Sequence, residues 1–177
     1  NKRMDEGKEV VVREGKEGLM KKIYRVVTEN GTEVLRELVE ECIISNPVSK
    51  IVEYGTVLNY KTSRGETLRY KKVLSMKATA YTSSYEDTGK TPDHPHFGIT
   101  YTGIKAKKGV IAVDPKVIPL GTRVYVEVPG SAPDYGYAVA ADIGGAVKGN
   151  IIDVYLEDVK SVQSWGVKTV KVYILMD

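Results

Sequence analysis

The apolar positions of this chain follow one pattern before residue 57 and another after residue 76. In residues 7–56 the apolar runs contain so many Lys, Arg and Glu residues that both faces of a strand would be exposed to solvent. Between two such runs stands Asn30-Gly31, and Asn-Gly flanked by β-rich segments is a strong hairpin signal. The pattern predicts a thin, extended β-sheet without a thick core. The alternative is a helix over residues 32–43, because four apolar residues there fall at helical spacing: Leu35, Leu38, Val39 and Cys42.

Residues 57–76 show no clean period over their length, and Ser63-Arg64-Gly65 within them is typical of a turn. We expect a linker here, with one strand at its end. This segment holds five basic residues and one acidic residue, so it accounts for the excess in the formal net charge of +3. Such a short basic segment is typical of a solvated connector, and no other feature supports a nucleic-acid partner.

Residues 77–177 alternate short apolar runs with glycine or proline turns, which predicts about six strands in a small β-barrel. One short amphipathic helix is expected over residues 157–165, ended by Gly166. The chain should therefore be all-β, with an extended β module at 1–56, a linker at 57–76 and a barrel at 77–177. The expected barrel core is Val110, Ile111, Val113, Val124, Val126, Val139, Ile152, Val154, Val170, Val172 and Ile174.

Two apolar runs near the end of the chain each carry one carboxylate, Asp142 and Asp153. The loop between them, residues 144–150, is too rich in glycine to be a core element. If the second run is a strand, alternation turns Asp153 away from its most apolar face. In the first run Asp142 shares a side with small alanines, which leave room over the sheet for a large ligand. A sugar chain would fit such a groove.

Composition sets wider bounds on the class of protein. The chain is 42% hydrophobic and 28% charged, which is ordinary for a globular protein of one or two domains. Cys42 is the single cysteine, so no internal disulfide can form. No apolar run is long enough to span a bilayer. The chain starts at Asn1 without a signal peptide, as a fragment excised from a longer protein would.

Three further positions have both a structural and a functional interpretation. Asp93, His94 and His96 could ligate a metal, but their spacing matches no strong signature, so no metal or other cofactor is expected. Asp114 stands before a proline at the end of an apolar strand, where it is equally a turn former and a site residue. Trp165 is expected to anchor the core and not to stack on sugar.

The first segment resembles the five-glycine (G5) domain of bacterial surface proteins. The resemblance rests on an EG-x-x-G motif, a YRV-like strand leading to Glu29-Asn30-Gly31, an Asn46-Pro47 turn and a final Gly55-Thr56. It implies an extended β module of extracellular or wall-associated proteins, with contact to N-acetylglucosamine as one proposed role. A spacer that holds the next domain away from the surface is the alternative role.

The second segment resembles the three-aspartate (3D) domain family, which is related to membrane-bound lytic transglycosylase A and to stationary-phase survival proteins of spore-forming bacteria. This resemblance implies a double-psi β-barrel in a wall-associated or extracellular protein. It also implies cleavage of the MurNAc-β-1,4-GlcNAc bond of peptidoglycan glycan strands with release of a 1,6-anhydro product. The motifs that carry it are Thr79-Ala80-Tyr81, Gly98-Ile99-Thr100, Thr102-Gly103, Val113-Asp114-Pro115, residues 118–122, and residues 141–155 with their DxGGAxKGxxxD core.

By this resemblance Asp153 is the catalytic acid/base, and Asp142 and Asp114 are the family's other aspartates. A glycosidic oxygen leaves poorly unless protonated, so one carboxyl must stay neutral near pH 6 to 7, held so by burial or by a nearby anion such as Asp142. Asp114 is expected to support the ends of the sheet. The remaining expected contacts to substrate are Thr100, Tyr81, Thr102, Lys148, Gly144 and Gly145.

Two other functions are compatible with the same residues. A related barrel could bind or loosen a wall polysaccharide without cutting it, the aspartates then acting as hydrogen-bond acceptors. A hydrolase could instead use two of the three carboxylates as acid and base. A lytic transglycosylase needs one carboxyl group alone, because the substrate's own C6 hydroxyl is the nucleophile.

Overall fold

The computed structural model describes residues 1–176, which divide into two compact units, one up to Thr56 and one from Val57 onward. Both units are built mainly from β-strands, and the helices are short. The all-β class predicted from the sequence is confirmed.

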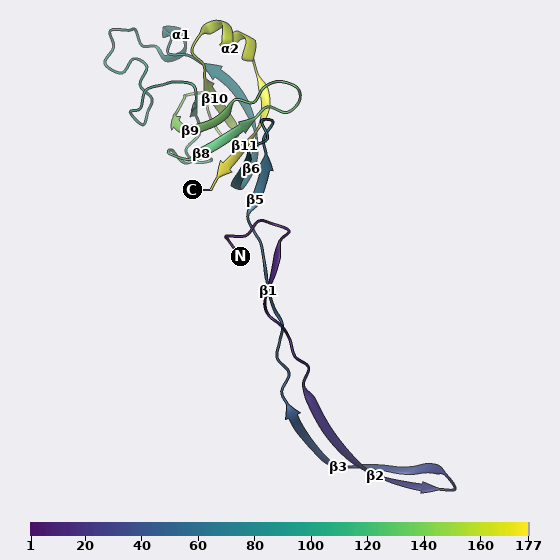
Figure 1. Ribbon diagram of the computed structural model, residues 1–177. Helices are drawn as coiled ribbons and strands as arrows, with labels where there is room; N and C mark the ends of the chain where they lie inside the picture. Colours follow the sequence, from purple (N-terminus) through teal and green to yellow (C-terminus); the bar gives the residue numbers. More distant parts are fainter. Residues whose placement is uncertain (177) are drawn as a thin grey trace. The chain divides into compact units, whose positions relative to one another are not determined.

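The first unit consists of two separate two-stranded sheets. Strand β1 (Glu9–Arg13) pairs antiparallel with β4 (Ile51–Tyr54), while β2 (Leu19–Glu29) and β3 (Thr32–Ser45) form a long hairpin (Figure 1). Every residue of β2 and β3 is exposed, so the thin module without a thick core is confirmed.

The hairpin turn falls on the predicted Asn30-Gly31 pair. Both residues have positive φ, 50° and 80°, as the two central residues of a type I′ turn require. Residues 32–43 are therefore strand and the helical alternative is wrong. Every residue of β3 is exposed, so a helical apolar stripe would have found nothing to pack on in the described unit, whereas pairing with β2 satisfies the backbone of β3 and allows cross-strand ion pairs such as Lys22–Glu41 at 3.2 Å.

Gly55, beside β4, touches the backbone of Asp5. A Cβ atom at position 55 would lie 1.9 Å from the carbonyl oxygen of Asp5, and backbone cannot yield as a flexible side chain does. We expect Gly55→Ala to open the pairing of β1 with β4 and to cost more than about 2 kcal/mol in local stability. Hydrogen exchange of the amides of these two strands measures the loss.

Gly15→Ala is the graded control for this substitution. The nearest atoms to a Cβ there are 3.2 Å away, so the loss of protection should be smaller. Unchanged amide protection in Gly55→Ala would contradict the close approach.

The second unit is a seven-stranded mixed sheet that closes on itself. Its strand order is β10-β7-β9-β8-β11-β6-β5, and a parallel pairing of β10 with β6 completes the barrel. Helix α1 (Tyr85–Thr88) and helix α2 (Val159–Trp165) lie at the same end of it (Figure 1). The strands are β5 (Leu58–Lys61), β6 (Thr67–Tyr81), β7 (Val110–Ala112), β8 (Arg123–Glu127), β9 (Gly136–Asp142), β10 (Ile151–Tyr155) and β11 (Lys168–Leu175).

Residues 57–76 differ from the linker expected there. They form β5 and most of β6, and β6 pairs along its length with β11. The physical reason is a small aromatic cluster, in which Leu68 and Tyr60 pack with Tyr125 and Tyr173 of the barrel. The many basic residues of this segment hide the apolar period of the strand in the sequence.

The predicted core is largely the observed one. Ile152 and Val154 of β10 point to the interior cluster, while Asp153 lies on the opposite face of the same strand. Val110 belongs to a second cluster on that opposite face, and Val139 packs against it. Ile174 is half-buried against the interior. The remaining predicted core residues, fully buried inside the barrel, are Ile111, Val113, Val124, Val126, Val170 and Val172.

Candidate active site

One row of residues crosses four neighbouring strands of the barrel. Thr79 of β6 is in register with Asp153 of β10, Asp153 with Ala112 of β7, and Ala112 with Asp142 of β9. The two aspartates therefore flank a small residue, with about 10 Å between their backbones, which is two strand spacings. The alanine between them is buried in the second hydrophobic cluster.

Asp153 is partly buried in this row. Among the described residues no donor reaches its buried Oδ1 atom. Burial, opposed by the neighbouring Thr79 hydroxyl and reinforced by the negative charges of Asp87 and Asp142, raises the pKa of Asp153 to about 6. This aspartic acid can thus hold its proton up to about pH 6, well above the range of an exposed aspartic acid, and release it to a base.

Asp142 is held in place by hydrogen bonds to both of its oxygens. Its Oδ2 accepts a hydrogen bond from the Tyr81 hydroxyl at 2.9 Å, and its Oδ1 accepts from the backbone N–H groups of Tyr101 at 2.9 Å and Ile143 at 3.0 Å. Burial first, and then the negative charge of Asp142, raise the pKa of Tyr81 far above its usual range, so this phenol stays a donor. The arrangement holds the charge of Asp142 near Asp153.

Asp114 supports the glycine-rich loop. Its Oδ2 accepts from the N–H of Gly149 at 2.8 Å and its Oδ1 from the N–H of Lys116 at 3.0 Å. These bonds, led by that from Gly149, and the positive charge of Lys148 lower the pKa of Asp114. Asp114 therefore lies just after the end of β7 and ties the glycine-rich loop to it through the bond from Gly149.

The raised pKa of Asp153 makes folding stability depend on pH. Because the folded state holds this proton more tightly than the unfolded state, stability falls as pH rises from about 4 to about 6 and stays lower above that range. Asp153→Asn removes the ionisation, so we expect it to raise the free energy of unfolding by ~1 kcal/mol at pH 8, after discounting for partial solvent exposure. Urea unfolding at pH 8 and pH 4 measures this.

At pH 4 the stability advantage of the Asp153→Asn variant should disappear, since Asp153 is then protonated in the folded parent protein. Equal free energies of unfolding for the variant and the parent at pH 8 would show that ionisation of Asp153 does not destabilise the folded state.

The structure separates the residues expected to contact substrate into two groups. Tyr81 and Thr100 are only 9% and 5% exposed, so neither offers a face to a sugar. The Thr100 hydroxyl bonds to the carbonyl of Ile104, and that of Thr102 to the carbonyl of Ala141, which docks the loop at 98–106 on β9. The exposed members are Thr102 and, in the glycine-rich loop, Lys148 and Gly145, while Gly144 is half-buried.

Three residues that interact with Asp153 or Asp142 were not identified from the sequence. Asp87, whose Oδ2 accepts from the N–H and hydroxyl of Thr82, adds negative charge near Asp153. The N-cap Ser84 three residues earlier was an available signal for the short helix that places it. Thr79 lies beside Asp153 only because β6 closes the barrel, and no local pattern shows that. Tyr101 binds Asp142 through its backbone while its ring is 67% exposed.

The remaining candidate positions, His94, His96 and Trp165, make contacts within the protein. His94 and His96 are exposed, and the N–H of His96 donates to Nδ1 of His94 at 3.1 Å. Within residues 1–176 no three His, Cys, Asp or Glu side chains come together as metal ligands would. Trp165 packs against the barrel core and donates from Nε1 to the carbonyl of Ala78, as the anchoring interpretation predicted.

No helix in the described part of the chain combines the length and apolar character needed to cross a membrane.

The fold and its carboxylate row define a β-barrel domain preceded by an extended β module, and known families match both parts. Residues 1–57 match the G5 domain and residues 109–176 match the 3D domain. The chain thus carries a G5 domain followed by a 3D domain, as its motifs indicated.

Relatives from Bacillus subtilis (strain 168) share this sequence. The "Putative cell wall shaping protein YabE" is 41% identical over 175 residues, covering 88% of this chain and 39% of that protein. The "Cell wall-binding protein YocH" is 49% identical over 108 residues, covering 59% of this chain and 33% of that protein. The chain thus spans well under half the length of either relative.

Solved structures resemble parts of the chain. Escherichia coli MltA covers 44% of this chain with 27% of its own, at 24% identity and a TM-score of 0.39. The lytic transglycosylase LtgG of Burkholderia pseudomallei covers 67% of this chain with 50% of its own, at 17% identity and a TM-score of 0.33.

Proposed function

We propose that this chain acts on the peptidoglycan of the bacterial cell wall as a lytic transglycosylase, with Asp153 as its acid and base. The proposal is supported by the 3D domain and by relatives named for shaping or binding the cell wall. The observation that carries it is the state of Asp153, a partly buried carboxyl with one oxygen that has no hydrogen-bond partner in residues 1–176 and with a pKa raised to about 6. The same relatives support a wall-associated location.

The reaction needs one proton donor that later accepts a proton. Asp153 donates its proton to the glycosidic oxygen as the bond from C1 of MurNAc breaks, and GlcNAc leaves with a free hydroxyl. The ionised Asp153 then takes the proton of the C6 hydroxyl of MurNAc as that oxygen bonds to C1. The product is a 1,6-anhydro sugar, the carboxyl is protonated again, and no water is consumed.

The hydrogen bonding of the other two aspartates favours this route over hydrolysis. A two-carboxylate glycosidase needs a second carboxylate free to attack the sugar or to activate water. Both oxygens of Asp142 accept hydrogen bonds from the protein, and so do both oxygens of Asp114. Of the three aspartates, Asp153 alone has a buried oxygen without a partner among the described residues.

The exposed groups around the row are suited to hold a glycan. The backbone N–H of Tyr101 donates a hydrogen bond to Asp142, and the side chain of the same residue is exposed. Aromatic faces commonly pack on sugar rings. Lys148 and the N–H groups of Gly144 and Gly145 lie in the loop that Asp114 supports. We assign these groups to binding and Asp153 to the chemistry. The G5 domain then serves as a spacer or as a second contact to N-acetylglucosamine.

Mass spectrometry of peptidoglycan digested with the purified chain tests the proposal. A lytic transglycosylase releases fragments that end in 1,6-anhydro-MurNAc, which are lighter by one water than hydrolytic products. Reducing MurNAc ends would instead show a hydrolase. Wall sedimentation of the chain without any released fragment would show a binding module.

A further inference from the structure

A second site lies on the barrel away from the carboxylate row. Two adjoining cavities of about 240 and 400 Å³ share Arg64, Lys108 and Tyr135 in their walls. The larger one continues to Trp165 and Lys168 beside helix α2. We call these five residues the cationic pocket. They come from four separate parts of the chain, which only the closed barrel brings together.

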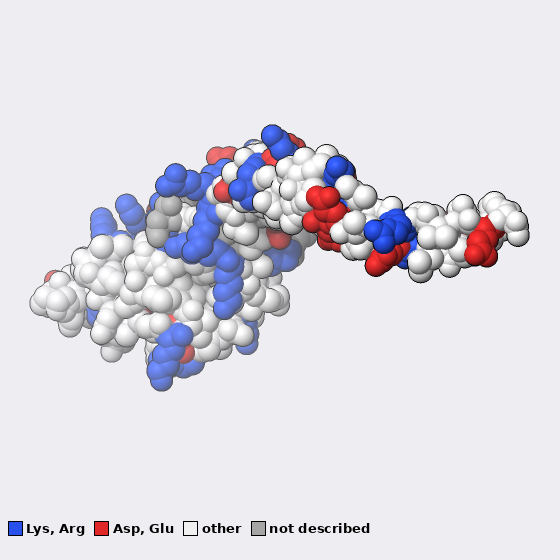
Figure 2. Space-filling view, turned by 90° about the horizontal axis from the view of Figure 1, so that it is seen from below, with Lys and Arg blue, Asp and Glu red and all other residues white. Residues whose placement is uncertain are grey.

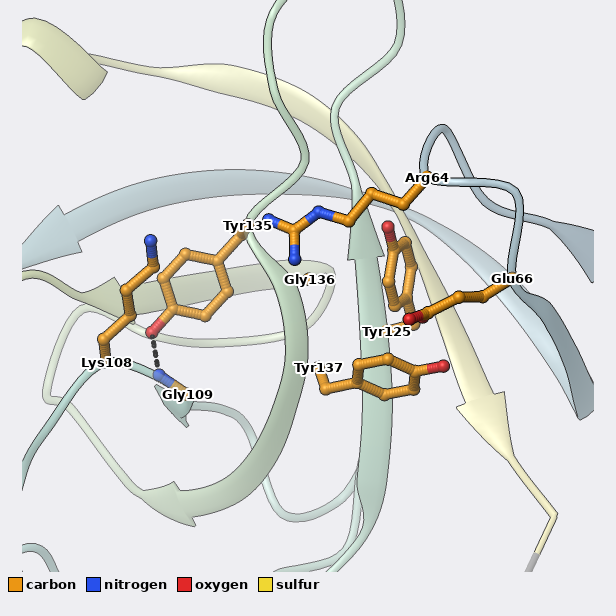
Figure 3. Close-up of a pocket in the computed structure, with 8 residues that line it drawn as sticks. All are labelled: Arg64, Glu66, Lys108, Gly109, Tyr125, Tyr135, Gly136 and Tyr137. Atoms are coloured by element: carbon orange, nitrogen blue, oxygen red, sulfur yellow. Dashed lines mark hydrogen bonds between the residues drawn. The ribbon is translucent and has the colours of Figure 1, made fainter.

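Three positive charges and two carboxylates line the two cavities: Arg64, Lys108 and Lys168, together with Glu66 and Asp134. Within residues 1–176 neither Arg64, Lys108 nor Lys168 has a carboxylate at ion-pair distance. Figure 3 shows Lys108 and Arg64 on opposite sides of the Tyr135 ring. Figure 2 shows that Lys and Arg also predominate over Asp and Glu on one face of the rounded unit. The charge of Arg64 already acts on Asp134, but the three cations outnumber the two carboxylates of the cavity walls, so an anionic group in the pocket would meet a net positive charge.

The pocket is held in shape by hydrogen bonds that do not use its cations. The turn that carries Arg64 is fastened to the β8–β9 loop, because the hydroxyl of Ser63 donates to Oδ2 of Asp134 at 2.7 Å. The Tyr125 hydroxyl also donates to Oδ2 of Asp134, and the N–H of Val128 donates to its Oδ1. The Tyr135 hydroxyl accepts from the N–H of Gly109 at 2.9 Å and lies within 3.0 Å of two backbone carbonyls. Hydrogen bonds thus hold in place the chain segments that carry these cations.

The floor of the pocket is apolar, with hydroxyls at its edge. Trp165 and Tyr135 meet edge to face, and Leu156 completes the floor. The Lys168 ammonium stands 5.4 Å from the centre of the Trp165 ring, a cation–π arrangement that holds this side chain against the indole. Ser161 and Ser164 of α2 add hydroxyls. A ligand for this surface combines carboxylates with small apolar groups.

We propose that the cationic pocket binds a short peptide that carries free carboxylates and small apolar side chains. Given the proposed function, on which this identification rests, the peptide is the stem attached to the glycan of peptidoglycan. Leu156 follows Asp153 by three residues, about 10 Å along an extended strand. Leu156 packs on the interior side of β10, opposite to Asp153, so a peptide attached to a glycan over Asp153 would reach the pocket around the end of the strand. An extended tetrapeptide of about 13 Å is long enough for this path, which favours the stem over an unattached anionic polymer.

Fluorescence of Trp165, the single tryptophan of the chain, reports on binding directly. The probe is the soluble tetrapeptide L-alanyl-γ-D-glutamyl-L-lysyl-D-alanine, with the same peptide amidated at every carboxylate as its control. We expect the free peptide to change the fluorescence saturably and the amidated peptide to bind at least about tenfold more weakly. Arg64→Ala and Lys108→Ala should each weaken binding several-fold.

Lys160→Ala is the matched control, because Lys160 is an exposed lysine of α2 outside the pocket wall. Its affinity for the peptide should equal that of the parent protein. Equal affinity of Arg64→Ala and the parent, or equal binding of the free and amidated peptides, would overturn the proposal. Binding of poly(glycerol phosphate) but not of the peptide would overturn it in favour of a phosphate polymer.

The outcome is separable from that of the proposed function. Asp153→Asn should bind the peptide with unchanged affinity, since Asp153 does not line the pocket. Peptide binding without any glycan cleavage would leave the pocket assigned and refute the transglycosylase.

Discussion

Asp153→Asn should abolish release of soluble fragments from purified peptidoglycan, lowering the rate by about 10²–10⁴-fold, the usual contribution of a general acid. The amide has nearly the same shape as the carboxyl but cannot protonate a glycosidic oxygen or later accept the proton of the C6 hydroxyl. The loss should therefore appear in the rate of bond cleavage while binding to the wall is retained. Fragment release over time, together with sedimentation of the protein with wall, measures the two separately.

Asp114→Asn is the matched control for this substitution. Asp114 is another of the three family aspartates, but both of its oxygens accept backbone hydrogen bonds, and an amide oxygen can keep one of them. We expect a smaller loss, within about tenfold, caused by a looser glycine-rich loop. If Asp153→Asn kept a tenth or more of the parental rate while remaining folded, the acid would have to be another residue.

Ile152→Ala should lower the free energy of unfolding of the barrel by about 3 kcal/mol, because it empties space at a fully buried position. Ile152 precedes Asp153 on β10 and points into the interior between strands that close the barrel. Urea unfolding followed by circular dichroism measures the change. The Trp165 signal should report the same transition, since its ring packs on the same core.

The neighbouring Ile151→Ala provides the comparison, since Ile151 is only partly buried on the face shared with Asp153. It should cost about 1 kcal/mol. Similar losses for the two variants would mean that β10 does not place alternate residues inside and outside the barrel, and Asp153 would then lose its exposed face.

Parts of this structure follow from local sequence patterns. Asn30-Gly31 suffices for the hairpin because its two positive φ angles are available to few other pairs. Strand β10 was predictable from alternation alone, with Ile152 and Val154 inside and Asp153 outside. A period of two residues acts within one strand, so it can be read without knowing the partners of that strand.

Other parts depend on contacts between distant segments. The segment 57–76 resembled a linker because its charged residues obscure a strand whose apolar residues meet Tyr125 and Tyr173, which are distant in the sequence. Closure of the barrel by β6 and β10 is equally non-local, and it is what places Thr79 beside Asp153. A single sequence carries no signal for such pairs.

The candidate site shows the same division. The motifs identified the three aspartates, but they did not show that hydrogen bonds occupy Asp142 and Asp114 while one oxygen of Asp153 has no partner among the described residues. They also suggested sugar contacts for Tyr81 and Thr100, both of which are buried. Whether a hydroxyl of the motif faces a ligand or a neighbouring loop is decided by packing, which the motif does not contain.

The central claim is that Asp153 holds its proton to a pH well above the ordinary range of an aspartic acid, and carbon-13 NMR of its carboxyl group tests that claim most directly. Titration of the purified chain from pH 3 to pH 8, with the signal assigned by its absence in Asp153→Asn, gives the pKa of this one group. We expect a pKa of about 6, caused mainly by burial. A value near 4, the ordinary range of an exposed aspartic acid, would contradict the claim.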